Sequence, residues 1–215
     1  MKIFCDFDGT ISPRDVGNEL FSRFTNGKAK EIVEKWKAGE IDSRAMYLRS
    51  IQHLQITKAE LEKFLLDQSI DPHFSRFVRF CEKRSFSTFI LSDGMDLYIR
   101  PILDRNELEH VAVYSNKLTW KDEKTLIAEF PYYDQTCGRC ANCKGYHLRR
   151  FSENGAESVL VGDGLSDICA AKEADLIFAK NDLEAYCRKE NIPFMPFRDF
   201  SDIMDGLEVH LMNNS

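Results

Sequence analysis

The sequence lacks long apolar runs. Hydrophobic residues make up 43% of its 215 residues, but the apolar segment at the start stops at Asp6, too early for the core of a signal peptide. No later run reaches the length of about 20 residues that a membrane-spanning helix needs. We therefore expect a cytoplasmic protein with no membrane partner.

Clustered positive charge is also missing. The formal net charge is −6, and basic pairs such as Arg149 and Arg150 do not extend into a stripe. A nucleic-acid partner requires Lys and Arg side chains that together replace the counterions of the phosphate backbone. The composition therefore argues against a nucleic-acid partner and leaves the oligomeric state open.

The seven cysteines lack the pattern of a disulfide framework, because their number is odd and no secretory segment accompanies them. Cys137, Cys140 and Cys143 have the spacing of zinc ligands, but a structural zinc site normally has four ligands and the sequence has no second Cys-x-x-Cys pair. His147 or another nearby group would have to complete the set. We expect a cysteine-rich loop with reduced thiols and keep zinc as the alternative.

Aspartates follow two strand-like segments. Ile3–Asp6 leads into Asp8, and Ser158–Gly162 leads into Asp163 and Asp167. Each pattern alone is also typical of an ordinary turn, but the carboxyl ends of parallel strands meet at one edge of a sheet. Carboxylates gathered there repel one another unless a cation offsets their charge, and Mg²⁺ prefers such oxygen ligands. The two segments together predict one magnesium site.

With these residues, the chain resembles the phosphatases of the haloacid dehalogenase superfamily. The motifs of that superfamily occur in the expected order: Asp6-Phe7-Asp8-Gly9-Thr10, Ser92 within Phe89-Ile90-Leu91-Ser92-Asp93-Gly94, Lys144, and Gly162-Asp163-Gly164-Leu165-Ser166-Asp167. They span most of the chain. The resemblance implies hydrolysis of a small phosphomonoester through an aspartyl-phosphate intermediate, with Mg²⁺ as the cofactor.

The resemblance also implies roles for the acids. Asp6 would attack phosphorus. Asp8 would protonate the leaving group and then deprotonate the hydrolytic water, which requires a raised pKa near neutral pH. Mg²⁺ would be bound by Asp6, by the backbone carbonyl of Asp8, by Asp163 and by Asp167, the last directly or through water.

The remaining motif residues would bind the substrate phosphate. Ser92 would donate its hydroxyl, the backbone of Asp93 and Gly94 would offer amides, Lys144 would supply an ammonium group, and Thr10 would contact phosphate or fix the loop. Two less specific interpretations remain open. Ser92 could be a helix N-cap, and Lys144 could be a solvated surface lysine.

The pattern of elements predicts an α/β fold. Strand-like segments alternate with helix-compatible stretches, as in a mostly parallel sheet with helices on both faces; these segments are Ile3–Asp6, Ser87–Ser92, Val111–Tyr114, Ser158–Gly162, Leu176–Ala179 and Phe194–Met195. The resemblance implies a Rossmann-like three-layer α/β/α core over residues 1–12 and 74–215, including a small hairpin and a cysteine-rich insertion at about 116–143. It also implies a helical cap over residues 13–73, inserted after the first strand.

The residue pattern of this insertion also predicts helices without the resemblance. Leu20–Leu66 has no strand pattern, and Thr57 followed by Glu60 is typical of a capping box before Leu61. A closing cap would exclude bulk water from the reaction; the alternative is that these helices merely extend the core.

The choice of substrate is less constrained. The Ser92 segment resembles the phosphoserine phosphatase-like branch, and the nearest likeness within it is to the methionine-salvage phosphatases, which act on 2-hydroxy-3-keto-5-methylthiopentenyl 1-phosphate. That reading predicts a mainly apolar pocket above Asp6. Asp15 stands where phosphoserine phosphatases usually have a longer Glu, which counts against phosphoserine but keeps it as an alternative. Phosphocholine and phosphoethanolamine are further alternatives, because Asp15 with Trp36 or Tyr47 could bind their ammonium groups.

The motifs also bear on other reactions of the superfamily and on a different class of function. A phosphotransferase remains possible, whereas Asp8 argues against a dehalogenase, which does not need an acid there. A phosphate-binding regulatory protein without turnover is disfavoured by the presence of both Asp6 and Asp8.

Overall fold

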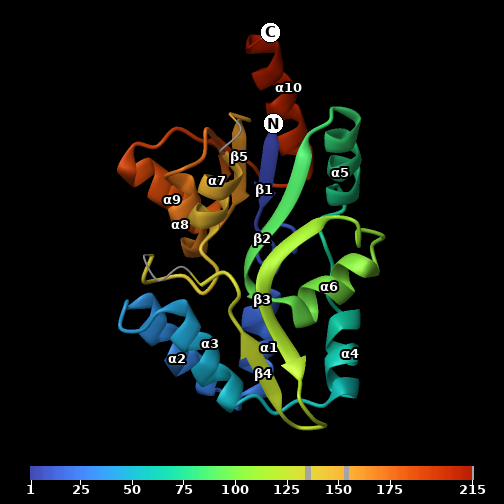
Figure 1. Ribbon diagram of the computed structural model, residues 1–215, viewed down its shortest axis with the longest axis vertical. Helices are drawn as coiled ribbons and strands as arrows, with labels where there is room; N and C mark the ends of the chain where they lie inside the picture. Colours follow the sequence, from blue (N-terminus) through green and yellow to red (C-terminus); the bar gives the residue numbers. More distant parts are fainter. Residues whose placement is uncertain (134–136, 153–154, 215) are drawn as a thin grey trace.

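A single mixed sheet forms the centre of the computed structural model, which describes residues 1–133, 137–152 and 155–214. Within these residues the sheet has seven strands in the order β4-β3-β2-β1-β5-β6-β7, and every neighbouring pair is parallel except β3 with β4 (Figure 1). The strands are β1 (Lys2–Cys5), β2 (Ser87–Met95), β3 (Ala112–Trp120), β4 (Leu126–Glu129), β5 (Ser158–Gly162), β6 (Leu176–Ala179) and β7 (Met195–Pro196). The predicted α/β class is confirmed.

Helices cover both faces of this sheet, because its central strands are apolar on both sides. In β1, Ile3 and Cys5 face one hydrophobic cluster and Phe4 faces the other. The first cluster is covered by α5 (Phe74–Lys83), α6 (Asp96–Asp104) and α10 (Phe200–Asn213), and the second by α7 (Lys144–Ser152), α8 (Ile168–Ala171) and α9 (Asn181–Glu190). A short 3₁₀ turn, η1 (Leu165–Asp167), precedes α8. The expected three-layer core is present.

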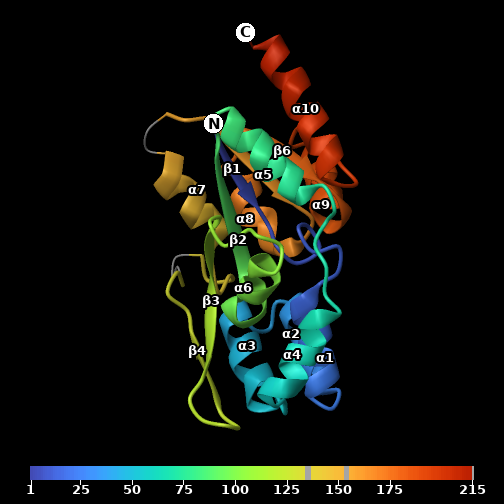
Figure 2. The same ribbon diagram turned by 90° about the vertical axis from the view of Figure 1, so that its right-hand side faces the viewer.

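Four further helices form a separate group beyond the carboxyl ends of β1 and β2 (Figures 1 and 2). They are α1 (Val16–Phe24), α2 (Lys28–Lys37), α3 (Ser43–Gln52) and α4 (Lys58–Leu66). The capping box expected before α4 is present, since Glu60 N–H donates to Thr57 Oγ1 at 3.2 Å and Thr57 N–H donates to the Glu60 carboxylate at 2.9 Å. The helical character predicted for Leu20–Leu66 is therefore confirmed.

Strand β3 is longer than the sequence predicts. Val111–Tyr114 and the later hairpin were expected as separate elements, but β3 runs unbroken from the sheet into the hairpin. Its first half pairs with β2, and its second half pairs with β4. Two hydrogen bonds hold the middle of β3 extended. The Asn116 side-chain Nδ2 donates to the Asp93 carbonyl oxygen (2.6 Å), and Leu118 N–H donates to Asp96 Oδ1 (2.9 Å). The middle of β3 is thus held by polar contacts, and its sequence lacks the alternation of apolar and polar residues by which a strand is recognised.

The order of the strands creates a crevice next to β1. The chain adds β2 and β3 on one side of β1 and then β5 and β6 on the other side. In open α/β sheets, ligands bind beyond the carboxyl ends of the strands where the order reverses in this way.

Among the helices of the described ranges, none is both long and apolar enough to cross a bilayer.

Candidate active site

Three aspartates meet at this crevice. Asp6 follows β1, Asp163 follows β5, and Asp167 ends η1. One carboxylate oxygen from each lies within 4.8 Å of the others, and the side chains of Asp6 and Asp167 are buried. The two strand ends that carry aspartates in the sequence therefore meet in the structure.

A buried lysine lies among these acids. Lys144 is the first residue of α7, and its Nζ lies 2.7 Å from Asp6 Oδ1 and 2.6 Å from Asp167 Oδ1. Its exposed fraction is 0%, so it is not a solvated surface lysine. Burial alone would lower the pKa of Lys144, but the charges of Asp167 and Asp6 raise it above its ordinary value, so the ammonium group stays protonated.

One ammonium group does not offset three carboxylates. Burial and the charge of Asp167 raise the pKa of Asp6 well above its ordinary value even though Lys144 opposes that rise. Burial and Asp167 also raise the pKa of Asp163 to about 6. Such shifts indicate unbalanced negative charge, and a divalent cation with a preference for oxygen ligands would balance it. These residues therefore fit a hard metal ion.

The loop after β1 holds Asp163 in place. Gly9 has a φ of +79°, and a Cβ there would overlap the Asp163 carboxylate, so both the backbone conformation and the close approach require glycine. The next residue, Thr10, donates its hydroxyl to Asp163 Oδ1 at 3.0 Å. Thr10 thus fixes an acid of the site in this structure.

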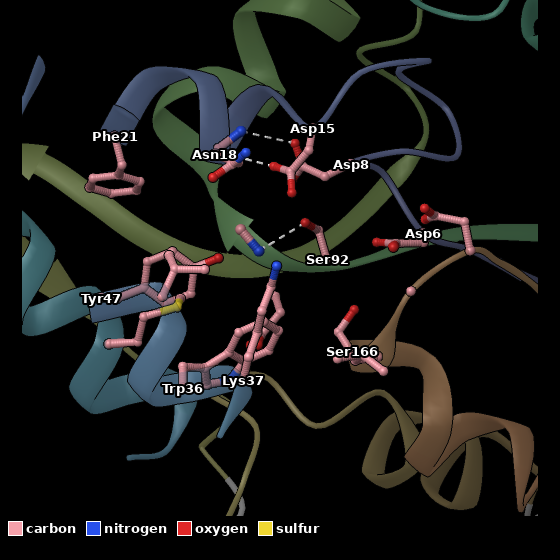
Figure 3. Close-up of a pocket in the computed structure, with 18 of the residues that line it drawn as sticks. Asp6, Asp8, Asp15, Asn18, Phe21, Trp36, Lys37, Tyr47, Ser92 and Ser166 are labelled. Atoms are coloured by element: carbon pink, nitrogen blue, oxygen red, sulfur yellow. Dashed lines mark hydrogen bonds between the residues drawn. The ribbon is translucent and has the colours of Figure 1, made fainter. Parts of the chain in front are cut away.

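Asp8 points away from the other acids and toward the helices α1–α4 (Figure 3). Its Oδ1 accepts a hydrogen bond from Gly17 N–H at 3.2 Å, and its Oδ2 accepts one from the Tyr98 hydroxyl at 2.7 Å. Burial and the charge of Asp15 raise the pKa of Asp8 to about 7, while these two hydrogen bonds oppose the rise. A carboxyl group with this pKa can both donate and accept a proton near neutral pH.

The segment after Ser92 belongs to β2 rather than to a helix N-terminus. Ser92 Oγ accepts a hydrogen bond from Gly94 N–H at 2.9 Å, whereas the N-cap of α6 is Met95, which makes no side-chain capping bond. The Gly94 amide, expected to face a ligand, is therefore engaged by Ser92. The Asp93 carboxylate accepts from Asn142 N–H at 2.6 Å, which ties β2 to the loop before Lys144.

The acids open into a cavity of about 310 Å³ that extends between α1, α2 and α3 (Figure 3). Ser92, Asp93 and Gly94 also line it. Its far side is apolar and aromatic, with Phe21, Val33, Trp36, Met46 and Tyr47. Two charged groups interrupt that lining, because Asp15 stands at the start of α1 and Lys37 extends into the cavity from α2. The mainly apolar pocket expected from the sequence is thus only partly realised.

Asp15 is oriented by its own helix. Its Oδ1 accepts the N–H of Asn18 at 2.7 Å, so it is the N-cap of α1. Burial raises the pKa of Asp15, and the nearby Lys37 charge opposes that rise. Asp15 also lines the cavity, where a residue that contacts the substrate is expected to lie.

Several residues of the site escaped the sequence interpretation, among them three polar ones. Tyr98 reaches Asp8 from α6, Lys37 enters from α2, and Asn142 bonds to Asp93 and, through its side-chain amide, to the Ser92 carbonyl oxygen at 2.9 Å. The first two come from helices whose orientation the sequence does not give. The position of Asn142, two residues before Lys144, was the one available signal.

The cysteine segment closes onto α8. Cys137, Cys140 and Cys143 meet Cys169, and one sulfur atom from each lies within 4.8 Å of the others. His147, suggested from the sequence as the fourth member, is not part of this group; its Nε2 is hydrogen-bonded to Asn142 Oδ1 at 2.7 Å. Cys169 was missed because it is 26 residues from Cys143 and forms no recognisable pair.

Comparisons with known proteins agree with this geometry. A family model described as putative phosphatase matches residues 1–191. A 2-hydroxy-3-keto-5-methylthiopentenyl-1-phosphate phosphatase from Bacillus cytotoxicus is 33% identical, and the match covers 99% of this chain and 97% of that protein. The corresponding phosphatase from Bacillus cereus is 28% identical over the same shares of the two chains.

Solved structures show the same fold. A phosphoserine phosphatase carrying a phospho-aspartyl intermediate analogue has a TM-score of 0.72 at 20% identity, covering 95% of this chain and 97% of that one. A substrate-bound phosphoserine phosphatase has the same TM-score at 19% identity, with coverage of 95% and 96%.

Proposed function

Since this chain belongs to the putative phosphatase family of the haloacid dehalogenase superfamily, and is thus a phosphomonoester hydrolase, we propose that it hydrolyses its substrate through an aspartyl-phosphate formed on Asp6. The observation that carries this proposal is the position of Asp6, buried at the end of the central strand and 2.7 Å from the Lys144 ammonium. Family membership also removes the non-catalytic alternative.

Asp6 and Lys144 would act together on the phosphate. A carboxylate that approaches a phosphate ester is repelled by its oxygens, so positive charge must lie at the same place. Lys144 supplies one such charge. The Ser92 hydroxyl accepts from Gly94 N–H, which leaves its own proton free to be donated to a phosphate oxygen. Thr10 contributes indirectly, through the orientation of Asp163.

We propose Mg²⁺ as the divalent cation that the family implies. The Asp6, Asp163 and Asp167 carboxylates would hold it, together with the backbone carbonyl of Asp8, whose side chain points elsewhere. When bound, Mg²⁺ supplies positive charge that lowers the repulsion between Asp6 and a phosphate oxygen.

Asp8 would transfer the protons. With a pKa of about 7, its carboxyl group can protonate the departing alkoxide, and the resulting carboxylate can then take a proton from the water that hydrolyses the aspartyl-phosphate. Gly17 N–H and the Tyr98 hydroxyl hold it beside the cavity. The helices α1–α4, within residues 13–73, would act as a cap that limits access of bulk water to this step.

The cavity supports 2-hydroxy-3-keto-5-methylthiopentenyl 1-phosphate as the substrate, the compound named for the relatives. A thioether packs well against aromatic rings and methionine, and Phe21, Trp36, Met46 and Tyr47 provide such a surface. Lys37 can donate to the hydroxyl and keto oxygens of this molecule.

Phosphoserine is the second candidate, because Asp15 and Lys37 could pair with its ammonium and carboxylate groups. Phosphoethanolamine and phosphocholine would use Asp15 and the aromatic rings but leave Lys37 without a partner.

The deciding experiment compares these four substrates with the purified protein and Mg²⁺. We expect kcat/KM for the thioether substrate to exceed that for phosphoserine by about 100-fold, which corresponds to about 2.7 kcal/mol in transition-state binding. The reverse preference would overturn the substrate assignment while leaving the phosphatase intact. No turnover of any phosphomonoester would overturn the proposed function itself.

Two variants test the charged groups of the cavity. Lys37→Met should raise KM for the thioether substrate by about tenfold with little change in kcat, whereas Lys35→Met, an exposed change on the same helix outside the cavity, should leave both unchanged. Asp15→Asn should mainly impair substrates that carry an ammonium group. Equal losses for all four substrates in Asp15→Asn would argue against a role in substrate choice.

A further inference from the structure

The four clustered cysteines come from two separate segments. Cys137, Cys140 and Cys143 lie on the loop that leads into α7, and Cys169 lies on α8. Cys140 and Cys143 are buried, and the other two are partly exposed. All four are free thiols in the structure. None of the four lines the cavity beside the acids.

The distances between the sulfur atoms match one kind of ligand. Cys169 Sγ lies 3.7 Å from Cys137 Sγ and 3.9 Å from Cys140 Sγ. A disulfide would bring two sulfurs to about 2.05 Å. Four thiolates around one zinc ion, each with a Zn–S bond of about 2.3 Å, would be about 3.8 Å apart. An iron–sulfur cluster would need space for several iron and sulfide ions between its cysteines, and sulfurs within 4.8 Å of one another leave room for a single ion.

The backbone around the cysteines is closely packed. A Cβ on Gly145 would come within 2.7 Å of the Cys169 carbonyl oxygen, so the first turn of α7 and the helix α8 are in direct contact. The Cys-x-x-Cys-x-x-Cys loop therefore presents its sulfurs to Cys169 across a fixed gap, which is the arrangement of a closed structural site with four protein ligands.

We propose that Cys137, Cys140, Cys143 and Cys169 bind one zinc ion that joins the loop before α7 to α8. Each thiol releases its proton to solvent as it binds the metal. Cys143 immediately precedes Lys144, and Cys169 follows Asp167 by two residues. The zinc ion thus fixes the two segments that bring Lys144 and Asp167 to their ion pair. The sequence favoured a cysteine-rich loop without metal, and the zinc site takes the place of that expectation.

Metal analysis tests the proposal directly. Protein purified without chelators, then dialysed against metal-free buffer, should contain about one zinc per chain. Cys140→Ser and Cys169→Ser should lose most of that zinc and melt about 10 °C lower. The matched control is Cys187→Ser, the same change at a buried cysteine outside the group, which should keep its zinc. Zinc retained in both Cys140→Ser and Cys169→Ser would overturn the proposal.

A measurement on the wild-type chain covers the case in which the variants fail to fold. Removal of the metal by a strong chelator should make these four thiols react with an alkylating reagent, and added zinc should protect them again. The amide of Asn142, which donates to Asp93, should exchange its hydrogen about tenfold faster without zinc. Metal-free wild-type protein, or protein with disulfides among these cysteines, would contradict the proposal.

Discussion

Asp6 and Asp8 are chemically identical and two positions apart, but their surroundings give them different tasks. The Lys144 ammonium, 2.7 Å from Asp6, opposes the rise in the pKa of Asp6 that burial and Asp167 cause, and a bound cation would favour the carboxylate needed for attack further. Asp8 faces a neutral hydroxyl and a backbone amide instead, so nothing positive offsets its burial and its pKa reaches about 7. The turn that follows β1 points the two carboxylates in different directions and so separates a nucleophile from an acid (Figure 3).

The pH profile should depend on Tyr98. Protonated Asp8 is required as the acid, so kcat/KM should fall above a pKa of about 7. The Tyr98 hydrogen bond lowers that pKa, and Tyr98→Phe should therefore move the alkaline limb upward, by up to about one unit. Tyr186→Phe, on α9 and away from the cavity, is the control. An unchanged or lower limb in Tyr98→Phe would contradict this account of Asp8.

Asp6→Asn should abolish turnover without loss of the fold. The amide has nearly the same size but is a poor nucleophile, so kcat should fall on the order of 10³-fold or more, while circular dichroism stays native. Asp8→Asn should slow both transfer steps. Turnover within a few-fold of the wild-type protein in either variant would rule out the role assigned to that aspartate.

At the level of elements, the capping box of α4 offers a test of local stability. Thr57→Ala removes the acceptor for Glu60 N–H and should cost about 1 kcal/mol, which lowers Tm by about 2–4 °C. Glu62→Ala, at an exposed position of the same helix, should change Tm much less. Thermal unfolding of the two variants side by side measures the difference; equal Tm values would show that the cap does not contribute.

Elements with a strong local signal were predictable, and those defined by tertiary contacts were not. The apolar runs of β1 and β5 and the Thr57 signal predict their elements because local sequence decides them. The middle of β3 is held by Asp93 and Asp96, which no local pattern reveals. The same limit applies to the site: motif aspartates were predicted, but Tyr98 and Lys37 are brought there by helix packing, and helix packing likewise brings Cys169 to the other three cysteines.

For the molecule as a whole, the two proposed metals should be separable. Mg²⁺ bound by carboxylates exchanges readily, whereas zinc held by four thiolates does not. Dialysis against magnesium-free buffer should therefore abolish phosphatase activity and leave about one zinc per chain, and added Mg²⁺ should restore activity. A control dialysed with Mg²⁺ present should stay active throughout. Full activity after exhaustive magnesium removal would contradict the magnesium requirement.

The position of β1 in the sheet has a consequence for synthesis on the ribosome. Strand β1 is synthesised before the other six strands of the described sheet, but one of its two neighbours is β5, and Lys2 pairs with Ser158. During translation the edge of β1 that pairs with β5 stays uncovered until most of the chain has emerged. Nascent chains that stop before residue 158 therefore expose an unpaired apolar strand edge, and they already carry Asp6 although Asp163 and Asp167, which would share its metal ion, are still to be made.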